Sequence, residues 1–254
     1  MAPDAKSADA KSADSAAEVT WFAERVTWYP SQRQYSRREL AFDAAINVLG
    51  VAAASVGGGA LLLSTSDNFP WLLRATLLAY VCSTQLCLAC SLAYNSLAWL
   101  SPRAVRWLKL ADHCGILALN VGSFGTPLAL AECERMLVSL WLLAVCSAWF
   151  KWRYPSEVGP VQVACFLAMG WAPVCVWQEV SDAVTTRART LGLCAGLCYS
   201  SGLLPFACSR LEGHTAVWHA FVLAGCAAVL AGHFELAQTD NWPSQTRERW
   251  GLVA

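Results

Sequence analysis

The chain has 254 residues, of which 56% are hydrophobic and 14% are charged, whereas soluble domains usually carry charge on about a quarter of their residues. The 18 lysine and arginine residues balance the 18 aspartate and glutamate residues, which excludes an extended basic surface for nucleic acid. This composition excludes a soluble globular domain and predicts an all-α integral membrane protein.

The amino-terminal region is polar and differs from the rest of the chain. Residues 1–18 repeat Asp-Ala-Lys-Ser-Ala almost in tandem and contain little that a folded core would bury, so we expect a disordered tail. They also lack the apolar segment of a signal peptide. Residues 19–38 mix aromatic with charged side chains, which is typical of a segment in the lipid headgroup region, and an ordinary juxtamembrane linker fits equally well.

Seven apolar stretches follow, each close to the roughly 20 residues that a helix needs to cross the hydrocarbon layer. They are Ala41–Ser64, Pro70–Leu97, Leu108–Ala131, Met136–Trp152, Pro160–Val180, Arg189–Ala207 and His214–Leu236. Backbone polar groups in lipid must be paired internally, so the sequence predicts a bundle of seven transmembrane helices over residues 39–236, followed by a carboxyl-terminal tail, 237–254. Pro127 and Pro173 predict kinks within their spans.

The charges beside the span ends predict an orientation. The amino terminus and the connections that follow even-numbered spans lie on the same membrane face. Basic residues beside the span ends are more numerous on this face than on the opposite one. By the positive-inside rule, we expect the amino terminus in the cytosol and the carboxyl terminus on the other side of the membrane.

Ionisable side chains within spans are costly in lipid and are candidates for function. Most of those in this chain fall within the first few turns from the predicted cytosolic face, which predicts a single polar layer. Its residues are Asp43, Asn47, Ser91, Asn95, Asp112, His113, His214 and His219. We expect Asn95, Asp112 and His219 to meet in a shared pocket. His113, at the start of its span, and His233, about four turns beyond His219, are expected to face the headgroups.

Several segments occur in the order and spacing of a known family. The segments SLAYN at 91–95, LADHCGI at 110–116 and GSFGTP at 122–127 resemble the central motif of the hemolysin III / progestin and adipoQ receptor family, and HTAVWHAFVLAG at 214–225 resembles its seventh span. The resemblance covers the chain from about residue 39 to residue 236. It implies a seven-helix bundle with an internal metal site that faces the cytosol.

The resemblance also implies a ligand set, from which this sequence departs. In that family, zinc is held by a histidine that ends the second span and by two histidines, spaced HxxxH, in the seventh, with an aspartate and a serine nearby. Here Asn95 and Thr215 occupy the first two ligand positions and only His219 is kept, together with Asp112 and Ser91. Amide and hydroxyl groups are poor zinc ligands. We therefore expect a lost or greatly weakened zinc site and no cofactor, with zinc as the alternative.

Without zinc, hydrogen bonds are expected to hold these helices together. Asn95 and Thr215 would bond across the second and seventh spans, and His219 would bond to Ser91 or Asn95 as a core histidine. Recruitment of His214 as a replacement ligand is disfavoured, because residues five apart on a helix point in different directions.

Three functions remain open. The first is a receptor-like or non-catalytic membrane protein with a lipid-accessible cavity for a lipid or sterol ligand. The second is a ceramidase-like, zinc-dependent lipid amidase or hydrolase, in which Asp112 and Ser91 would be catalytic. The third is a pore-forming or lytic protein. A retinal protein is excluded, because no lysine follows Lys151. The expected partners are membrane lipids, and nucleic acid is not one of them.

Overall fold

The computed structural model describes residues 36–65, 69–97, 102–154, 159–208 and 210–252. Within these ranges every regular element is a helix, and seven helical segments are long and apolar enough to cross a membrane. The predicted all-α, seven-span fold is therefore confirmed. The expectations for residues 1–18, and for 19–35 of the juxtamembrane segment, lie outside the described residues.

Most spans begin and end within a few residues of the predicted positions, but the third begins at Pro102, six residues before the predicted Leu108. They are α2 (Arg37–Ser64), α3 (Trp71–Leu97), α4 (Pro102–Leu130), α5 (Glu134–Arg153), α6 (Gly159–Trp171) continued by α7 (Trp177–Ala183), α8 (Thr186–Ala207) and α9 (His214–Leu236). The fifth span is interrupted by a 3₁₀ turn, Ala172–Val176, which contains Pro173. Proline lacks the N–H that would continue the helical ladder, so this break confirms the predicted kink. Pro127 lies inside α4 without interrupting it.

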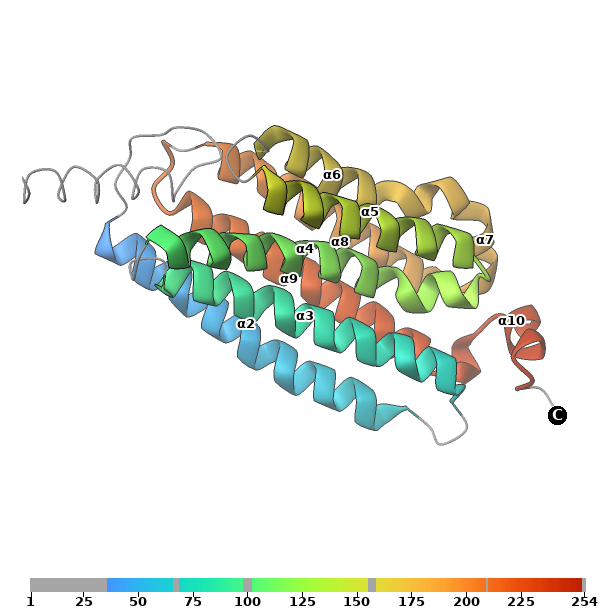
Figure 1. Cartoon of the computed structure of the whole chain (residues 1–254). Coiled ribbons are helices and arrows are strands. Elements are labelled where there is room, and N and C mark those ends of the chain that lie inside the picture. The colour runs from blue at the N-terminus through green and yellow to red at the C-terminus, as the bar shows by residue number, and fades with distance from the viewer. Residues whose placement is uncertain (1–35, 66–68, 98–101, 155–158, 209, 253–254) are drawn as a thin grey trace, which may run out of the picture.

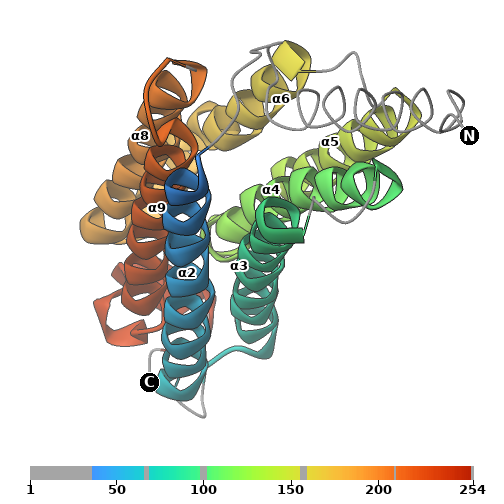
Figure 2. The same cartoon turned by 90° about the vertical axis from the view of Figure 1, so that its left-hand side faces the viewer.

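The spans form one bundle in which the chain reverses direction at each connection (Figure 1). In the end view of Figure 2, α2 lies between α3 and α9, α4 and α5 follow beyond α3, and α8 follows beyond α9. Helix α6 contacts both α4 and α8 and closes the remaining side. The first, second, third and seventh spans are therefore neighbours, as a shared polar layer requires.

The inner face of α2 is polar at its start. Ser36 and Glu39 form a capping box, in which the Ser36 hydroxyl accepts from the Glu39 backbone N–H at 3.2 Å and the Glu39 carboxylate accepts from the Ser36 N–H at 2.9 Å. The second carboxylate oxygen of Glu39 accepts from the backbone N–H of Gly213, the N-cap of α9, at 2.7 Å. The two helix starts are thereby joined, and this fixes Asp43, one turn further along α2, opposite the first turns of α9.

Helices α3 and α4 approach closely through glycines. A Cβ atom added at Gly115 would lie 2.7 Å from the Cα of Cys87, and one added at Gly122 would lie 2.0 Å from the Ser83 hydroxyl oxygen. Small residues allow such backbone proximity within membranes. The close packing holds Ser91, one turn beyond Cys87, in one pocket with Asp112 of α4.

The carboxyl-terminal segment packs on the end of the bundle opposite the start of α2 (Figure 1). Trp242 is 3% exposed, and its ring N–H donates to the Leu236 carbonyl at 2.8 Å. Thr246, in the short helix α10 (Ser244–Arg249), donates its hydroxyl to the Ala183 carbonyl at 3.0 Å. Residues of the predicted tail therefore cover the ends of α7 and α9.

Candidate functional site

The site is centred on the His219 imidazole, which bridges three helices. Its Nδ1 lies 2.6 Å from a carboxylate oxygen of Asp43 on α2, and its Nε2 lies 3.1 Å from the Ser91 hydroxyl on α3. With the ring proton on Nδ1, the imidazole donates to the Asp43 carboxylate and its Nε2 accepts from the Ser91 hydroxyl. The His219 ring therefore links α2, α3 and α9 through side-chain hydrogen bonds.

Two asparagines flank this chain. The Asn47 amide donates to the Asp43 backbone carbonyl at 2.9 Å and lies 3.2 Å from Nδ1 of His219. The Asn95 amide donates to the Ser91 carbonyl at 2.9 Å and lies 3.4 Å from the Ser91 hydroxyl oxygen. Asp43, Asn47 and Ser91 are all buried. The polar groups are therefore paired with one another inside the bundle, as low-dielectric surroundings require.

The hydrogen bond between Asn95 and Thr215 stays a prediction. The Asn95 amide reaches back one turn along its own helix to Ser91, a common bond for asparagine. The link between α3 and α9 runs through Ser91 and His219, which was the expectation for His219 as a core histidine. Thr215 lines the cavity described below.

Asp112 of α4 lies beside Ser91 and His219 and lines the same cavity as Asn95 and His219. The structure thus brings together the three residues whose convergence the sequence predicts. The roles assigned to Asp112 and Ser91 in a catalytic alternative remain predictions.

Two further histidines, His113 and His233, also line the cavity described below. His113 is 2% exposed, with its ring edge-on to Phe166 of α6, and His233 is 2% exposed and stacked on Tyr80 at 4.1 Å between ring centres. The expectation that His113 and His233 face the headgroups is therefore wrong, because neighbouring helices cover both rings. His214 bonds through Nδ1 to the Phe206 carbonyl at 3.1 Å, and its place in the polar layer stays a prediction.

The side chains at this site do not fit a zinc site of three imidazoles. No group of three or more histidine, cysteine, aspartate or glutamate side chains arranged to hold a metal occurs within the described ranges. Both ring nitrogens of His219 are engaged by Asp43 and Ser91, and the Asn95 amide is directed at Ser91. A zinc ion would need one of these imidazole nitrogens unprotonated and free.

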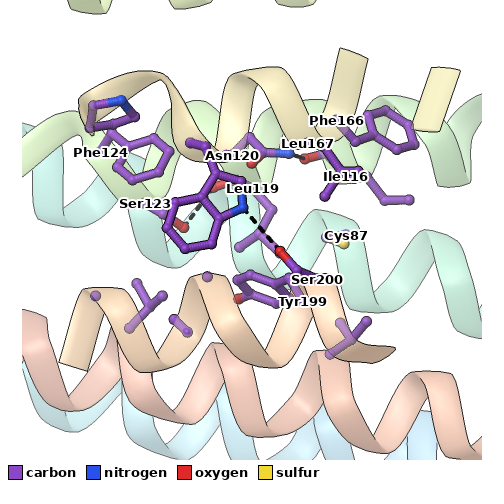
Figure 3. Close-up of a pocket in the computed structure, with 18 of the residues that line it drawn as sticks. Cys87, Ile116, Leu119, Asn120, Ser123, Phe124, Phe166, Leu167, Tyr199 and Ser200 are labelled. Carbon is purple, nitrogen blue, oxygen red and sulfur yellow. Dashed lines mark hydrogen bonds between the residues drawn. The ribbon is translucent and has the colours of Figure 1, made fainter. Parts of the chain in front are cut away.

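A cavity of about 310 Å³ runs beside the site along the inside of the bundle. Figure 3 shows its middle section, where Leu119, Phe124 and Phe166 from α4 and α6 face Tyr199 and Ser200 of α8. The Trp171 ring N–H donates to the Ser200 hydroxyl at 3.0 Å across it. Residues of α9 line it from Thr215 to Leu236, about 30 Å of helix at 1.5 Å per residue. The cavity therefore extends over most of the span.

A smaller pocket of about 40 Å³ adjoins the cavity at its polar end. Ser91 and Asn47 line only this pocket, whereas Cys87, Asp112 and His219 line both spaces. These shared residues place the Ser91 hydroxyl directly behind the cavity wall.

Two structural contributors were missed from the sequence. Glu39 is 5% exposed and ties α2 to α9, and Trp171 crosses the cavity to reach α8. The Ser36–Glu39 spacing of a capping box was a readable signal for Glu39. No comparable pattern indicates a partner for Trp171.

The fold and the site define a class: a multi-pass membrane protein of seven helices, with a polar site inside the bundle at one end of a mainly apolar cavity. The chain belongs to the haemolysin-III related family, which it matches over residues 46–230. It is 28% identical to Hemolysin-3 of Bacillus cereus over 131 residues, or 50% of this chain and 59% of that protein. It is also 28% identical to the Hemolysin-3 homolog of Bacillus subtilis (strain 168) over 127 residues, or 48% of this chain and 59% of the relative. The chain thus spans about three fifths of the length of these relatives.

Proposed function

We propose that this protein is a receptor-like membrane protein that holds a lipid within its bundle. The observation that carries the proposal is the cavity, which has mainly apolar walls and has Asp43, Asp112 and His219 among the ionisable groups that line it. Ligand sites are typically apolar hollows with a few polar groups that fix the orientation. An acyl chain would lie along the walls, and its polar end would bond near Asp112 and Asn95.

The walls also favour a lipid over an ion. Side chains such as Leu119, Leu203 and Val222 offer no replacement for the hydration shell that an ion must lose. The word hemolysin in the names of the relatives keeps a lytic function as the alternative for this chain. Release of a dye from lipid vesicles by the purified protein would favour that alternative.

Two adjacent leucines of α8 allow a direct test of lipid binding. Leu203 lines the cavity, whereas Leu204 is 74% exposed on the outside of the bundle. A photoactivatable long-chain fatty acid should crosslink to cavity residues of the wild type. Crosslinking should fall at least about fivefold in Leu203→Trp, because one blocked apolar contact lowers the binding free energy by about 1 kcal/mol. Crosslinking should be unchanged in Leu204→Trp. Equal crosslinking in both variants would refute the proposal.

We also infer that the polar end of the cavity functions without bound zinc. The support is the hydrogen bonding of both His219 nitrogens and the replacement of two imidazoles by Asn95 and Thr215. After dialysis against a metal-free buffer, the wild type should retain no zinc. An Asn95→His plus Thr215→His variant should retain zinc, because all three positions line the same cavity. Stoichiometric zinc in the wild type would contradict the inference and favour a zinc-dependent lipid hydrolase.

The amino terminus is proposed to face the cytosol. The support is the excess of basic residues beside the span ends on the membrane face that the amino terminus shares. A reporter that is active only outside the cytosol, fused after residue 254, should be active. The same reporter at the amino terminus should be silent, and the reverse pattern would overturn the orientation.

A further inference from the structure

We propose that the middle of the cavity contains a second polar site, which recognises a hydroxyl group part-way along the chain of a bound lipid. The site consists of Asn120 of α4 and Ser200 of α8, both of which line the cavity. This inference rests on the proposed function and deepens it, because it names the chemical class of the ligand. That class is a long-chain lipid with a hydroxyl group near the middle of its chain.

The side-chain oxygen of Asn120 is available to a ligand. The Asn120 amide nitrogen donates to the Ile116 carbonyl of its own helix at 3.2 Å, which leaves the side-chain oxygen without a donor among the described residues (Figure 3). Across from this oxygen lies Gly170 of α6, where an added Cβ atom would come within 3.4 Å of it. Because Gly170 has no side chain, the cavity keeps space in front of the oxygen.

The depth of Asn120 makes an unpaired oxygen costly. Asn120 lies about 12 Å beyond Asp112 along α4, at 1.5 Å per residue, and the helix continues to Leu130. A polar group without a partner is unfavourable in such apolar surroundings, and asparagine side chains within membranes commonly bond across helices. Asn120 bonds back to its own helix, so a contact between helices does not account for its oxygen. A donor on the ligand would account for it.

Ser200 offers a donor at the same depth on the facing wall. Its hydroxyl oxygen accepts from the Trp171 ring N–H at 3.0 Å, and its own proton has no acceptor in the part of the chain that the structure describes (Figure 3). Trp171 directly follows Gly170 in α6, which places Ser200 and Asn120 at one level of the cavity. A hydroxyl group can donate to the Asn120 oxygen and accept from Ser200, whereas an alkyl chain can do neither.

Apolar side chains separate this level from the polar end of the cavity. Ile116 and Leu119 of α4 and Val222 of α9 line the space between them. The arrangement fits a ligand with a polar head, an apolar stretch of about 12 Å and then a hydroxyl group. A saturated chain would leave Asn120 and Ser200 without partners, and a site with such polar groups binds an analogue that lacks the hydroxyl less tightly.

Competition between two fatty acids tests the site. The photoactivatable fatty acid described above is crosslinked to the wild type in the presence of an unlabelled competitor. One competitor is a saturated long-chain fatty acid, and the other is the acid of equal length with a hydroxyl group at mid-chain. The hydroxylated acid should displace the probe at a concentration at least about fivefold lower, the factor expected from one ordinary hydrogen bond.

Variants then assign this preference to the site. Asn120→Leu should abolish it, because leucine is of similar size but offers no acceptor, and Ser200→Ala should reduce it. The matched control is Ser201→Ala, since the Ser201 hydroxyl donates to the Leu197 carbonyl of its own helix at 2.6 Å, and this variant should keep the full preference. Each competitor enters the detergent equally in all samples, so a difference between variants reports the site itself.

The probe carries no hydroxyl group, so its crosslinking without competitor shows whether each variant is folded. If Asn120→Leu does not crosslink, the comparison of Ser200→Ala with Ser201→Ala decides. Equal displacement by the two acids in the wild type would overturn this inference and leave lipid binding intact. A preference that persists in folded Asn120→Leu would do the same. Failure of the probe to crosslink to the wild type would refute lipid binding and this inference with it.

Discussion

The contact between α3 and α4 makes a quantitative prediction at Gly115. In Gly115→Ala the new methyl group would lie 2.7 Å from the Cα of Cys87, an atom of the α3 backbone. Carbon atoms pack at about 3.5–4.0 Å, so the helices would have to separate by about 1 Å, which forfeits about a quarter to a half of the dispersion energy at the contact. Such overpacking costs about 1–3 kcal/mol. Replacement of a helical glycine by alanine by itself stabilises the helix by about 1 kcal/mol, which offsets part of this cost.

The net expectation for Gly115→Ala is a loss of up to about 2 kcal/mol, or up to about 8 °C in the thermal midpoint for a chain of this length. The assay is thermal unfolding of purified protein in detergent. The control is Gly59→Ala, because a Cβ at Gly59 of α2 meets no atom within 4 Å and should leave the midpoint unchanged or raise it. Equal midpoints for the two variants would refute the reasoning.

Three further predictions concern stability in the same assay. Asp43→Asn and His219→Gln should each lower the stability of the protein, and their effects should be non-additive by about 1–3 kcal/mol because the two side chains bond directly at 2.6 Å. Additive effects would contradict a specific interaction between the two residues. Trp242→Ala should cost about 3–5 kcal/mol, since the ring is 3% exposed, whereas replacement of Trp141, which is 50% exposed, should cost much less. Glu39→Ala should cost about 1–3 kcal/mol by leaving the N–H of the α9 N-cap without its acceptor; an unchanged midpoint would exclude that role.

The spans could be predicted from the sequence because hydropathy and length are properties of one segment at a time. The end of the second span and the start of the seventh were also placed correctly, whereas the third begins at Pro102, earlier than predicted. The distance of a residue from the end of its span sets its approximate depth in a bundle of antiparallel neighbours. Asn95, Asp112 and His219 accordingly line one cavity. The depth of each residue in the bundle, together with the order of the spans along the chain, is therefore enough to predict which residues share a polar layer.

Depth does not fix how each helix is rotated about its own axis. The bond from α3 to α9 is made by Ser91 and His219, and the Asn95 amide bonds back to Ser91 on its own helix. His233 lies near the end of its span, as expected of a residue that faces headgroups, but neighbouring helices bury its ring. His113 is also buried and lies well inside α4, which begins at Pro102. Rotation depends on close approaches such as that between Gly115 and Cys87, which involve residues on two helices and leave no pattern in either one.

The His219 imidazole is the point at which a zinc site and the present hydrogen-bonded arrangement exclude each other. A metal on either nitrogen of His219 would displace the bond to Asp43 or the bond to Ser91. Of the three positions where imidazoles would hold zinc, Asn95 and Thr215 occupy two, which leaves a metal only His219. A variant that regains zinc through Asn95→His and Thr215→His should therefore lose one of the two hydrogen bonds of the His219 ring.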